Sequence, residues 1–335
     1  MIFCFDEDRS FFNYILEKDN IKYTVALSPT DSVVLLHTPY PWTFSWAKRV
    51  DEILGQNPSR VIVFVTELHQ PIADWINQHP NLEYYVAGTV NGITHYNYMD
   101  WFAITRDFYK NRTHLLQDLH RRPVPEQYKV NALLGRKKQH RDLIYDLLLR
   151  NKQVTMTYMQ TQHGIADNVS DPAQFIWEGT PQSVNWTIDQ IEYDGEQVSL
   201  SQVIPTEVYR NTDWCLVAET NYQDGYVFFT EKTAKPIIAK RPFLIVGNPN
   251  SLRLLRQLGF QTFNSVIDES YDTDRVLESR VKKVADQVNY LTSLDAWRVR
   301  TMHHRINEIV EHNYQVMMST DWQQTQLQEL SEMIR

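Results

Sequence analysis

The sequence has few cysteines, no long apolar run and no excess of positive charge. Its two cysteines, Cys4 and Cys215, both lie inside apolar, strand-like stretches, which predicts buried free thiols instead of a disulfide framework or a metal site. The longest apolar runs, such as residues 61–65 and 243–246, have the length of a strand and are far too short to span a membrane. The first residues meet Asp6 without a basic region, so we expect a first β-strand instead of a signal peptide, and a cytoplasmic protein without a transmembrane segment.

The balance of charge is acidic, with a formal net charge of −8 and a pI of about 5.8. A broad nucleic-acid footprint would need a basic surface, so this balance counts against one but leaves a local basic cleft open. The hydrophobic content of 42% and charged content of 22% are those of a globular protein. A length of 335 residues fits two domains of ordinary size.

The first third of the chain alternates short apolar runs with amphipathic stretches. We expect strands at residues 2–5, 23–27, 33–36, 61–65 and 84–87, and helices at residues 12–18, 45–54 and 72–78. Alternation of this kind is typical of a parallel sheet with helices packed on its faces. An aromatic, irregular interval over residues 96–118 predicts one or two helices that close this domain.

Two prolines then break the pattern. The segment HRRPVP (120–125) can neither continue a helix nor occupy a central strand. We therefore place the interdomain linker here, after an N-terminal α/β domain of residues 1–122, and expect a C-terminal α/β domain over residues 128–300 and a helical tail over 301–335. In the second domain we expect strands at residues 129–134, 154–158, 214–218 and 243–246, and helices at 138–150, 231–240, 251–258 and from 274 onward.

Two consecutive α/β sandwiches followed by helices resemble the outline of the GT-B glycosyltransferases, which have two Rossmann-like domains. In that architecture the donor nucleotide sits on the C-terminal domain and the acceptor approaches from the N-terminal one. Ligands of open α/β sheets bind at the carboxyl ends of the strands, which here means the loops after Leu134, Ala218 and Thr230. Because a fold alone does not fix the chemistry, these loops have to supply it.

The loop GRKKQHR (135–141) joins a predicted strand to a helix and carries four cations, Arg136 and Arg141 among them. Cations in the first turn oppose the helix dipole by about 0.3–1 kcal/mol each when exposed. A bound anion such as a diphosphate would relieve that conflict, because free amides and fixed cations stabilise charge on a leaving phosphate. A solvated basic turn is the alternative interpretation of the same residues.

The segment YVFFTEKTAKP (226–236) runs from a short apolar stretch into Thr230, a plausible N-cap. Glu231 and Lys232 then fall in the first turn of the helix, beside its free amides. A carboxylate there can bond sugar or ribose hydroxyls, and Lys232 can reach a phosphate. A capped surface helix would show the same residues without any ligand.

These stretches together resemble the α1,3-fucosyltransferase family. WCLVAETN (214–221), then Tyr226-Val227, Thr230-Glu231-Lys232 and PFLIVG (242–247) are similar to that family's strand, its Glu-Asn-Ser-like turn, its Tyr-Val-Thr-Glu-Lys segment and its second strand ending in glycine. RDLIYDLL (141–148) is similar to the family's Arg-Asn-x-x-Tyr-x-x-Leu helix. The resemblance covers residues 128–260.

The resemblance implies a role for each matching residue. Arg141 and Lys232 would contact the diphosphate of a UDP- or GDP-linked sugar, Glu219 would bond the ribose, and Glu231 the sugar or ribose. The sequence departs from the family at Phe228-Phe229, a two-residue insertion, and at Thr220, which replaces the Asn of the turn. These departures leave the donor sugar open, and fucose is one candidate among others.

An inverting transfer needs a general base on the acceptor side. Glu67 follows the predicted strand at 61–65 and resembles the acid of the family's Phe-Thr-Gly-Glu turn, so it is our candidate base. A helix-capping or surface acid is the alternative, and Asp6 and Glu7 are the reserve candidates. Two cleft histidines, His69 and His95, are candidates as well, although a lone histidine is more often structural.

Metal-ligand patterns are weak. Asp272-Thr273-Asp274 has the Asp-x-Asp spacing that GT-A enzymes use for a divalent metal, but it precedes a predicted helix whose dipole such acids favour. His303-His304 lies on a predicted helix, where adjacent residues point in different directions and chelate poorly. We expect no metal.

The sequence therefore predicts an inverting, metal-independent glycosyltransferase that transfers a hexose or pentose from a nucleotide sugar to an acceptor hydroxyl. A saccharide is the expected acceptor. A viral-type enzyme acting on hydroxymethylated pyrimidines in DNA, and a non-catalytic nucleotide-sugar-binding protein, are the alternatives.

Overall fold

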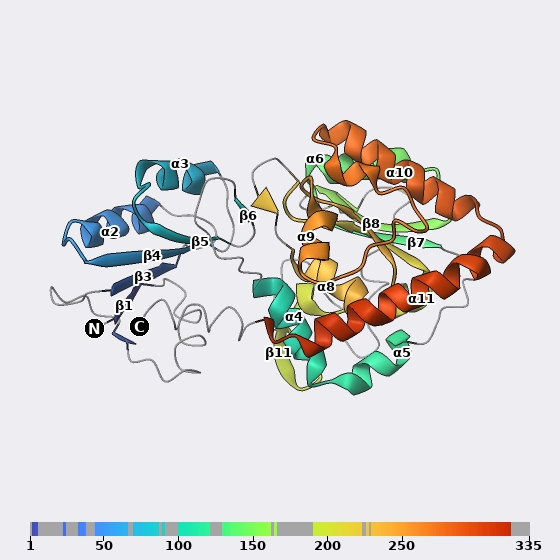
Figure 1. Ribbon diagram of the computed structural model, residues 1–335, viewed down its shortest axis with the longest axis horizontal. Coiled ribbons are helices and arrows are strands. Elements are labelled where there is room, and N and C mark those ends of the chain that lie inside the picture. Colours follow the sequence, from blue (N-terminus) through green and yellow to red (C-terminus); the bar gives the residue numbers. More distant parts are fainter. Residues whose placement is uncertain are drawn as a thin grey trace. The chain divides into compact units, whose positions relative to one another are not determined.

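The computed structural model describes residues 2–5, 23–24, 33–37, 44–65, 70–86, 89–90, 100–120, 129–161, 164–165, 190–222, 226–227 and 229–322. The chain divides into two compact units, Met1–Asp100 with Asp321–Arg335, and Trp101–Thr320. Among the described residues, no helix is both long and apolar enough to cross a membrane. Figure 1 shows the elements of each unit.

The first unit contains a five-stranded parallel sheet in the order β2-β1-β3-β4-β5. Its centre is buried, as the apolar run Val61–Val65 shows, and a continuous apolar run is typical of a strand in a parallel sheet that is covered on both faces. The strands are β1 (Ile2–Phe5), β2 (Tyr23–Thr24), β3 (Val33–His37), β4 (Arg60–Val65) and β5 (Glu83–Val86), with the short β6 (Thr89–Val90) after them, and the helices are α2 (Phe44–Leu54) and α3 (Gln70–Gln78).

The second unit contains the sheet β14-β12-β7-β8-β9, which is parallel except for the edge pair β8 and β9. Every residue of its strands β12 and β14 is buried. The strands are β7 (Val130–Arg136), β8 (Val154–Thr161), β9 (Gly164–Ile165), β12 (Trp214–Ala218) and β14 (Phe243–Val246), and β13 (Tyr226–Val227) lies between the last two in the chain.

Helices cover both faces of this second sheet. Figure 1 shows α6 (Gln139–Leu148) and α10 (Leu277–Ser293) on one side and α8 (Glu231–Ile238) and α11 (Ala296–Ser319) on the other. Lys129 Nζ donates to the carbonyls of Thr292 and Leu294 at the end of α10, where a cation complements the helix dipole. The remaining helices are α4 (Asp100–Lys110), α5 (Leu116–His120), α7 (Thr206–Arg210) and α9 (Ser251–Gln257), with 3₁₀ turns at Thr113–Leu115, Leu200–Gln202 and Ser270–Thr273.

An antiparallel hairpin interrupts the alternation between β8 and β12. It is formed by β10 (Gln190–Tyr193) and β11 (Glu196–Ser199). Its two-residue turn, Asp194-Gly195, has both residues at positive φ, the conformation that tight hairpins require. The Asp194 carboxylate also binds Arg112 Nε at 3.0 Å, which ties the hairpin to the segment between α4 and α5.

The expected mixture of parallel sheets and helices is confirmed. The strands of the two sheets begin and end within a few residues of the predicted ones. The predicted helix at 12–18 lies outside the described residues, and so does the proline-containing segment 121–125. By its internal contacts the chain divides at Asp100/Trp101, and the predicted linker after residue 122 lies outside the described residues. The reason is packing, because the Phe102 ring of α4 lies against Phe229 and Phe260 of the second unit, with ring centroids 6.3 and 6.1 Å away.

Candidate functional site

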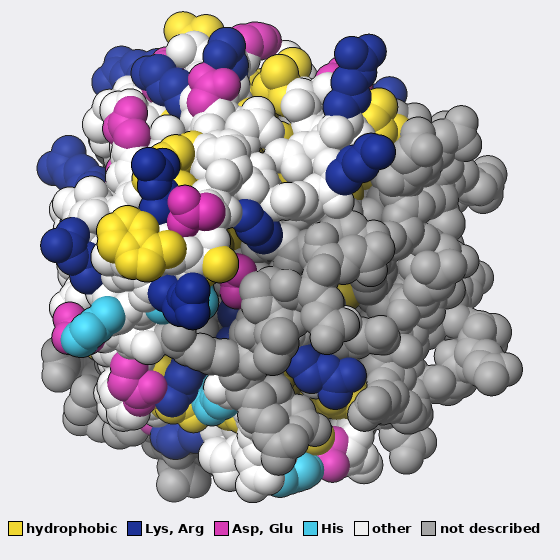
Figure 2. All heavy atoms as spheres, turned by 90° about the vertical axis from the view of Figure 1, so that its right-hand side faces the viewer, with side chains coloured by type: hydrophobic (Ala, Val, Ile, Leu, Met, Phe, Trp, Pro, Cys, Tyr) yellow, Lys and Arg dark blue, Asp and Glu magenta, His cyan; other side chains and the backbone are white. Residues whose placement is uncertain are grey.

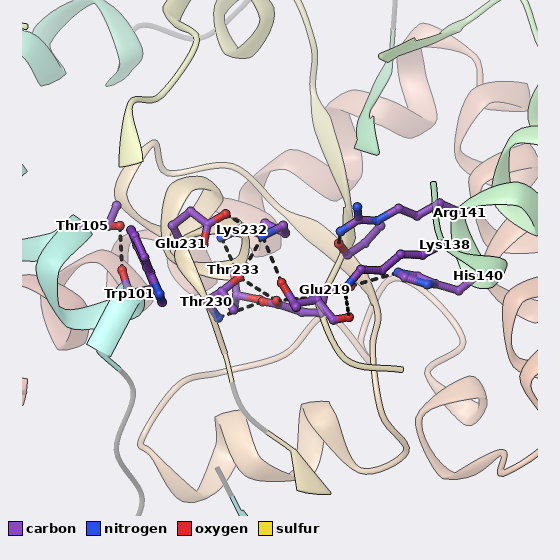
Figure 3. Close-up of polar contacts among 12 residues, drawn as sticks. Trp101, Thr105, Lys138, His140, Arg141, Glu219, Thr230, Glu231, Lys232 and Thr233 are labelled. Carbon is purple, nitrogen blue, oxygen red and sulfur yellow. Dashed lines mark hydrogen bonds and ion pairs between the residues drawn. The ribbon is translucent and has the colours of Figure 1, made fainter. Parts of the chain in front are cut away.

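The order of the strands creates a topological switch point in the second sheet, and we use the word crevice for the set of loops at this point. From β7 the chain passes through α6 to β8 on one side, and later returns as β12 on the other side of β7. At such a switch point the two neighbouring loops diverge, and ligands bind outside the carboxyl ends of the strands. The loops after β7 and β12, together with the start of α8, supply the residues of this crevice (Figure 3).

Helix α8 begins at the crevice, and its first amides already have partners within the protein. Thr230 is the N-cap, as its sequence position predicts, and its hydroxyl accepts a hydrogen bond from the Lys232 amide at 3.3 Å. Glu231 and Lys232 form the first turn. The positive end of the helix dipole at this point favours a nearby anion.

Glu219 joins the end of β12 to the start of α8. One carboxylate oxygen accepts from the Thr230 amide at 3.2 Å and the Thr233 hydroxyl at 2.5 Å. The other accepts from the Thr230 hydroxyl at 2.7 Å and the Thr220 amide at 3.1 Å. The side chain is 1% exposed. A buried carboxylate with four donors is fully solvated by protein groups, so it fixes the geometry of the strand, the loop and the helix together.

Lys232 and Glu231 form an ion pair next to the residues that surround Glu219. Lys232 Nζ lies 2.6 Å from Glu231 Oε1 and 3.2 Å from the Thr220 hydroxyl. Burial by itself would raise the pKa of Glu231, but the charges of Lys232 and Lys235 outweigh it and hold that pKa below its ordinary value. Glu231 is therefore an anion at neutral pH, able to accept hydrogen bonds from hydroxyl groups.

Lys235 lies one turn further along α8 and is half-buried. Burial lowers the pKa of its ammonium group to about 8, and Lys232 lowers it further while Glu231 opposes both. A nearby anion would restore the charged form, because an opposite charge stabilises protonated lysine.

The start of α6 faces the same loop from the other side. Lys138 Nζ donates to the Thr220 carbonyl at 2.9 Å, His140 Nε2 to the Glu219 carbonyl at 2.9 Å, and an Arg141 guanidinium nitrogen to the Ala218 carbonyl at 3.3 Å. Three successive carbonyls thus receive three side chains from one helix start (Figure 3). We call residues 218–222 the β12 loop.

Arg141 is buried under the ends of β7 and β12, with 4% of it exposed. Gly135 at the end of β7 has φ of +65°, and a Cβ there would lie 3.6 Å from the guanidinium. Glycine adopts that conformation without strain. Burial lowers the pKa of Arg141, while Glu219 and Glu231 raise it; arginine nevertheless keeps its proton. The guanidinium is a fixed cation at the centre of the crevice.

His140 is neutral. Burial and the charge of Arg141 lower its pKa to about 2, so Nε2 carries the proton that it donates to Glu219. Its ring stacks on Tyr222, with centroids 4.1 Å apart. The Tyr222 carbonyl in turn accepts a hydrogen bond from the buried Arg280 of α10 at 2.7 Å. The β12 loop is therefore held at both ends.

The structure brings together four of the predicted site residues: Arg141, Glu219, Glu231 and Lys232. Arg136 is the last residue of β7, and its side chain lies outside the described part of the chain. The candidate base Glu67 lies outside it too, as do the reserve candidates Asp6, Glu7, His69 and His95. For these residues the predictions stay predictions.

Several contacts in the site had no clear signal in the sequence. His140 lies inside the basic loop 135–141 but was not a candidate there, because its role depends on a carbonyl 79 positions away in the chain. The hydroxyls of Thr220 and Thr233 become functional groups because they bind Lys232 and Glu219, respectively. Only the tertiary structure pairs such short, common side chains.

Asp272 and Asp274 have different partners. The Asp272 carboxylate accepts from the amides of Leu252 and Arg253 at the start of α9, at 2.8 and 3.1 Å. The Asp274 carboxylate accepts from the Ser279 hydroxyl and pairs with Lys283 at 2.6 Å near the start of α10. The helix dipole favours carboxylates near helix starts. This is the alternative to a metal site that the sequence indicated. Among the described residues, no three metal-ligating side chains cluster.

The prediction of a buried free thiol is confirmed for Cys215. Cys215 is a free, buried thiol in β12 and accepts a hydrogen bond from the Asn131 amide at 3.2 Å. Burial raises its pKa to about 12, which keeps the thiol protonated and unreactive. The side chain of Cys4 lies outside the described residues.

Chemically, the crevice can hold an anion and hydroxyl groups at the same time. Arg141 and Lys232 supply cations, the start of α8 supplies the positive end of a helix dipole, and Glu231 supplies a carboxylate for hydroxyl groups. Comparison with known proteins does not assign the chain to a family. No family model and no curated protein matches the chain. One solved structure, titled "Crystal Structure of alpha1,3-Fucosyltransferase", matches at 12% sequence identity with a TM-score of 0.44, over 91% of this chain and 88% of that one. A TM-score below 0.5 does not establish a shared fold.

Proposed function

We propose that this chain is a glycosyltransferase, a hexosyl- or pentosyltransferase that moves a sugar from a nucleotide-sugar donor to an acceptor hydroxyl. One observation carries the proposal. Two cations from different helices, Arg141 and Lys232, bind the β12 loop at the positive end of the α8 dipole, at the switch point of a parallel sheet. Such a cradle suits a diphosphate, and the family resemblance of residues 128–260 supplies the reaction class.

In this proposal each residue has a separate role. Arg141 and Lys232 bind the diphosphate, with Arg136 as a further cation at the end of β7. Glu231 accepts hydrogen bonds from the sugar or the ribose. Glu219 would bond the ribose, as the resemblance implies, only by releasing Thr230 or Thr233, because its four donors already surround the carboxylate.

The proposed reaction is an inverting displacement without a metal. A carboxylate base, for which Glu67 is the candidate, takes the proton of the acceptor hydroxyl. The acceptor oxygen forms a bond to the anomeric carbon while the bond from that carbon to the phosphate oxygen breaks. The electron pair goes to the leaving nucleoside diphosphate, whose growing charge Arg141 and Lys232 stabilise.

A thermal-shift screen across UDP-, GDP-, CMP- and dTDP-sugars tests the donor site. A ligand that binds the folded state stabilises it by about 2.7 kcal/mol at a hundred times its Kd. We expect one nucleotide class to raise the Tm of the wild type. The shift should shrink strongly in Lys232→Ala and persist in the control Lys282→Ala, which removes an exposed α10 lysine paired with Asp286. No shift with any donor, or an equal shift in Lys232→Ala, would contradict the phosphate site.

A transfer assay then separates the acceptors. We expect product on a saccharide acceptor with the donor that the screen identifies, and loss of product in Glu67→Gln. Product only on DNA containing hydroxymethylated pyrimidines, with DNA affinity that falls steeply as salt rises, would favour the DNA-directed alternative. Donor binding without turnover on any acceptor would favour the non-catalytic alternative.

A further inference from the structure

The turn between α10 and α11 presents exposed aromatic side chains on a part of the second unit that is remote in sequence from the crevice residues. Trp297, near the start of α11, is 69% exposed, and Tyr290, in the last turn of α10, is 44% exposed. Single exposed apolar residues are common. A tryptophan exposed to this degree is unusual, because its large apolar surface is costly to leave in water.

The helix geometry shows that Trp297 points away from the protein core. At about 100° per residue, Trp297 lies about 180° around α11 from Ile306, which is buried. The buried side chains of α11 begin only at Ile306, so the preceding ten residues, 296–305, contribute none to the core. The same periodicity places Tyr290 about 180° around α10 from Val281 and about 160° from Val288, which are both buried.

Exposed cations lie in the same part of the protein as these aromatic side chains. Arg298, Arg300 and Arg305 are exposed in the first three turns of α11. The loop between α6 and β8 adds two more, because the Asn151 side chain donates to Asn289 Oδ1 at 2.8 Å and to the Thr292 hydroxyl at 2.9 Å in the last turns of α10. The exposed residues on either side of Asn151 are Arg150 and Lys152.

We call this surface the α10–α11 patch and define it by Arg150, Lys152, Tyr290, Trp297, Arg298, Arg300 and Arg305. Figure 2 looks onto the side of the protein where α10 meets α11, and it shows a large exposed hydrophobic side chain with several Lys and Arg side chains, and also acidic and His side chains, around it. The whole chain carries a net charge of −8. A cluster of five cations on such a chain is a local exception that favours an anionic partner.

We propose that the α10–α11 patch docks the protein on an anionic lipid bilayer. Tryptophan and tyrosine favour the level of the lipid headgroups, where the ring is half in hydrocarbon and its N–H or O–H stays hydrated. Arginine and lysine extend their apolar stems over the same boundary and place their charges among the headgroup phosphates. An outward tryptophan with flanking arginines has both features. A nucleic-acid duplex would match the cations, but its bases are already stacked inside the double helix and would leave the two aromatic rings without a base to stack on.

Vesicle co-sedimentation of the full chain tests this proposal. We expect binding to vesicles of phosphatidylcholine mixed with phosphatidylglycerol, little binding to phosphatidylcholine alone, and loss of binding at high salt. The affinity for mixed vesicles should fall about fivefold for each arginine removed, so Arg298→Gln with Arg300→Gln should bind more than tenfold more weakly. Trp297→Ala should also bind several-fold more weakly, because the apolar anchor is lost.

Matched controls remove an equally exposed group elsewhere. Val276→Ala changes a side chain that is 60% exposed at the other end of α10, and the pair Arg210→Gln with Arg253→Gln removes two exposed cations outside the patch. Both controls should bind mixed vesicles like the wild type. All of these positions are exposed, and circular dichroism spectra identical to wild type verify that each variant is folded.

Three outcomes would overturn the proposal. The first is no binding to mixed vesicles, and the second is binding that Trp297→Ala and the arginine pair leave unchanged. The third is Trp297-dependent binding of a DNA duplex, or Trp297-dependent self-association in sedimentation, without vesicle binding. Each outcome is independent of the proposed transfer reaction, since donor-induced thermal shifts should be the same in Trp297→Ala and the wild type.

Discussion

At the residue scale, one buried carboxylate organises the site. Glu219 receives four hydrogen bonds from three threonines while it is 1% exposed. The sequence pointed to the loop after Ala218, because ligands bind at the carboxyl ends of parallel strands, and the family resemblance then singled out Glu219. Its partners Thr230 and Thr233 come from a helix start 11 and 14 residues away, and no local pattern connects them to it.

Glu219→Gln tests this organisation. Each carboxylate oxygen accepts two hydrogen bonds, so the amide nitrogen of Gln would face donors and leave buried groups unsatisfied. We expect a loss of about 1–3 kcal/mol in the free energy of unfolding, measured by urea denaturation. The control Glu278→Gln changes an exposed acid of α10 and should cost much less. Equal stability of the two variants would contradict the structural role of Glu219.

Lys235 gives the site a pH dependence. Its pKa is about 8 in the folded protein, against 10.5 for an ordinary lysine, so the unfolded chain binds more protons between these values. The free energy of unfolding therefore rises with pH through this window. We expect it to rise more between pH 7 and 9 in the wild type than in Lys235→Met, as followed by urea denaturation at each pH. Parallel curves for the two proteins would rule out a depressed pKa.

At the element scale, the start of α8 links fold and function. Its helix was predictable from the N-cap Thr230 and the acid that follows, because these features satisfy free amides locally. The predicted end at Lys240 was two residues too long, since α8 ends at Ile238 and Lys240 adopts φ of +53°. A left-handed residue that ends a helix is usually Gly or Asn, so the lysine gave no signal.

Thr230→Ala and Thr230→Ser separate the cap from the side-chain volume. Thr230→Ala removes the hydroxyl that accepts from the Lys232 amide and donates to Glu219. We expect a loss of about 1–2 kcal/mol and a lower donor-induced thermal shift, while Thr230→Ser keeps both hydrogen bonds and stays near the wild type. If the two variants unfold alike, the hydroxyl is not what stabilises α8.

At the scale of the whole molecule, the sequence predicted two parallel sheets because apolar strands alternate with amphipathic helices. It placed the break between them at prolines, which are local signals. The structure divides the chain at Asp100/Trp101. That position depends on long-range aromatic packing, and the Phe229 of the two-residue insertion is one of the packed rings, with 1% of it exposed.

Phe102→Ala tests whether α4 belongs to the second unit. Phe102 is fully buried, and its truncation leaves a cavity beside Phe229 and Phe260. We expect a loss of about 3–5 kcal/mol in the free energy of unfolding, measured by urea denaturation. Hydrogen exchange of the β12 and β14 amides should show reduced protection in the same variant. If the protection of those amides from exchange is the same as in the wild type, α4 does not belong to the second unit.

The contacts of the β12 loop also bear on how strongly a ligand can bind. Lys138, Arg141 and Lys232 already donate to oxygens of residues 218 and 220. Each bond that they make to a phosphate must replace or share an existing one, so the heat released on donor binding should be small. The same contacts hold the cations in place beforehand and reduce the entropy lost on binding. We therefore expect isothermal calorimetry to show donor affinity that comes mainly from a favourable entropy change, and a large exothermic signal would mean that the loop rearranges.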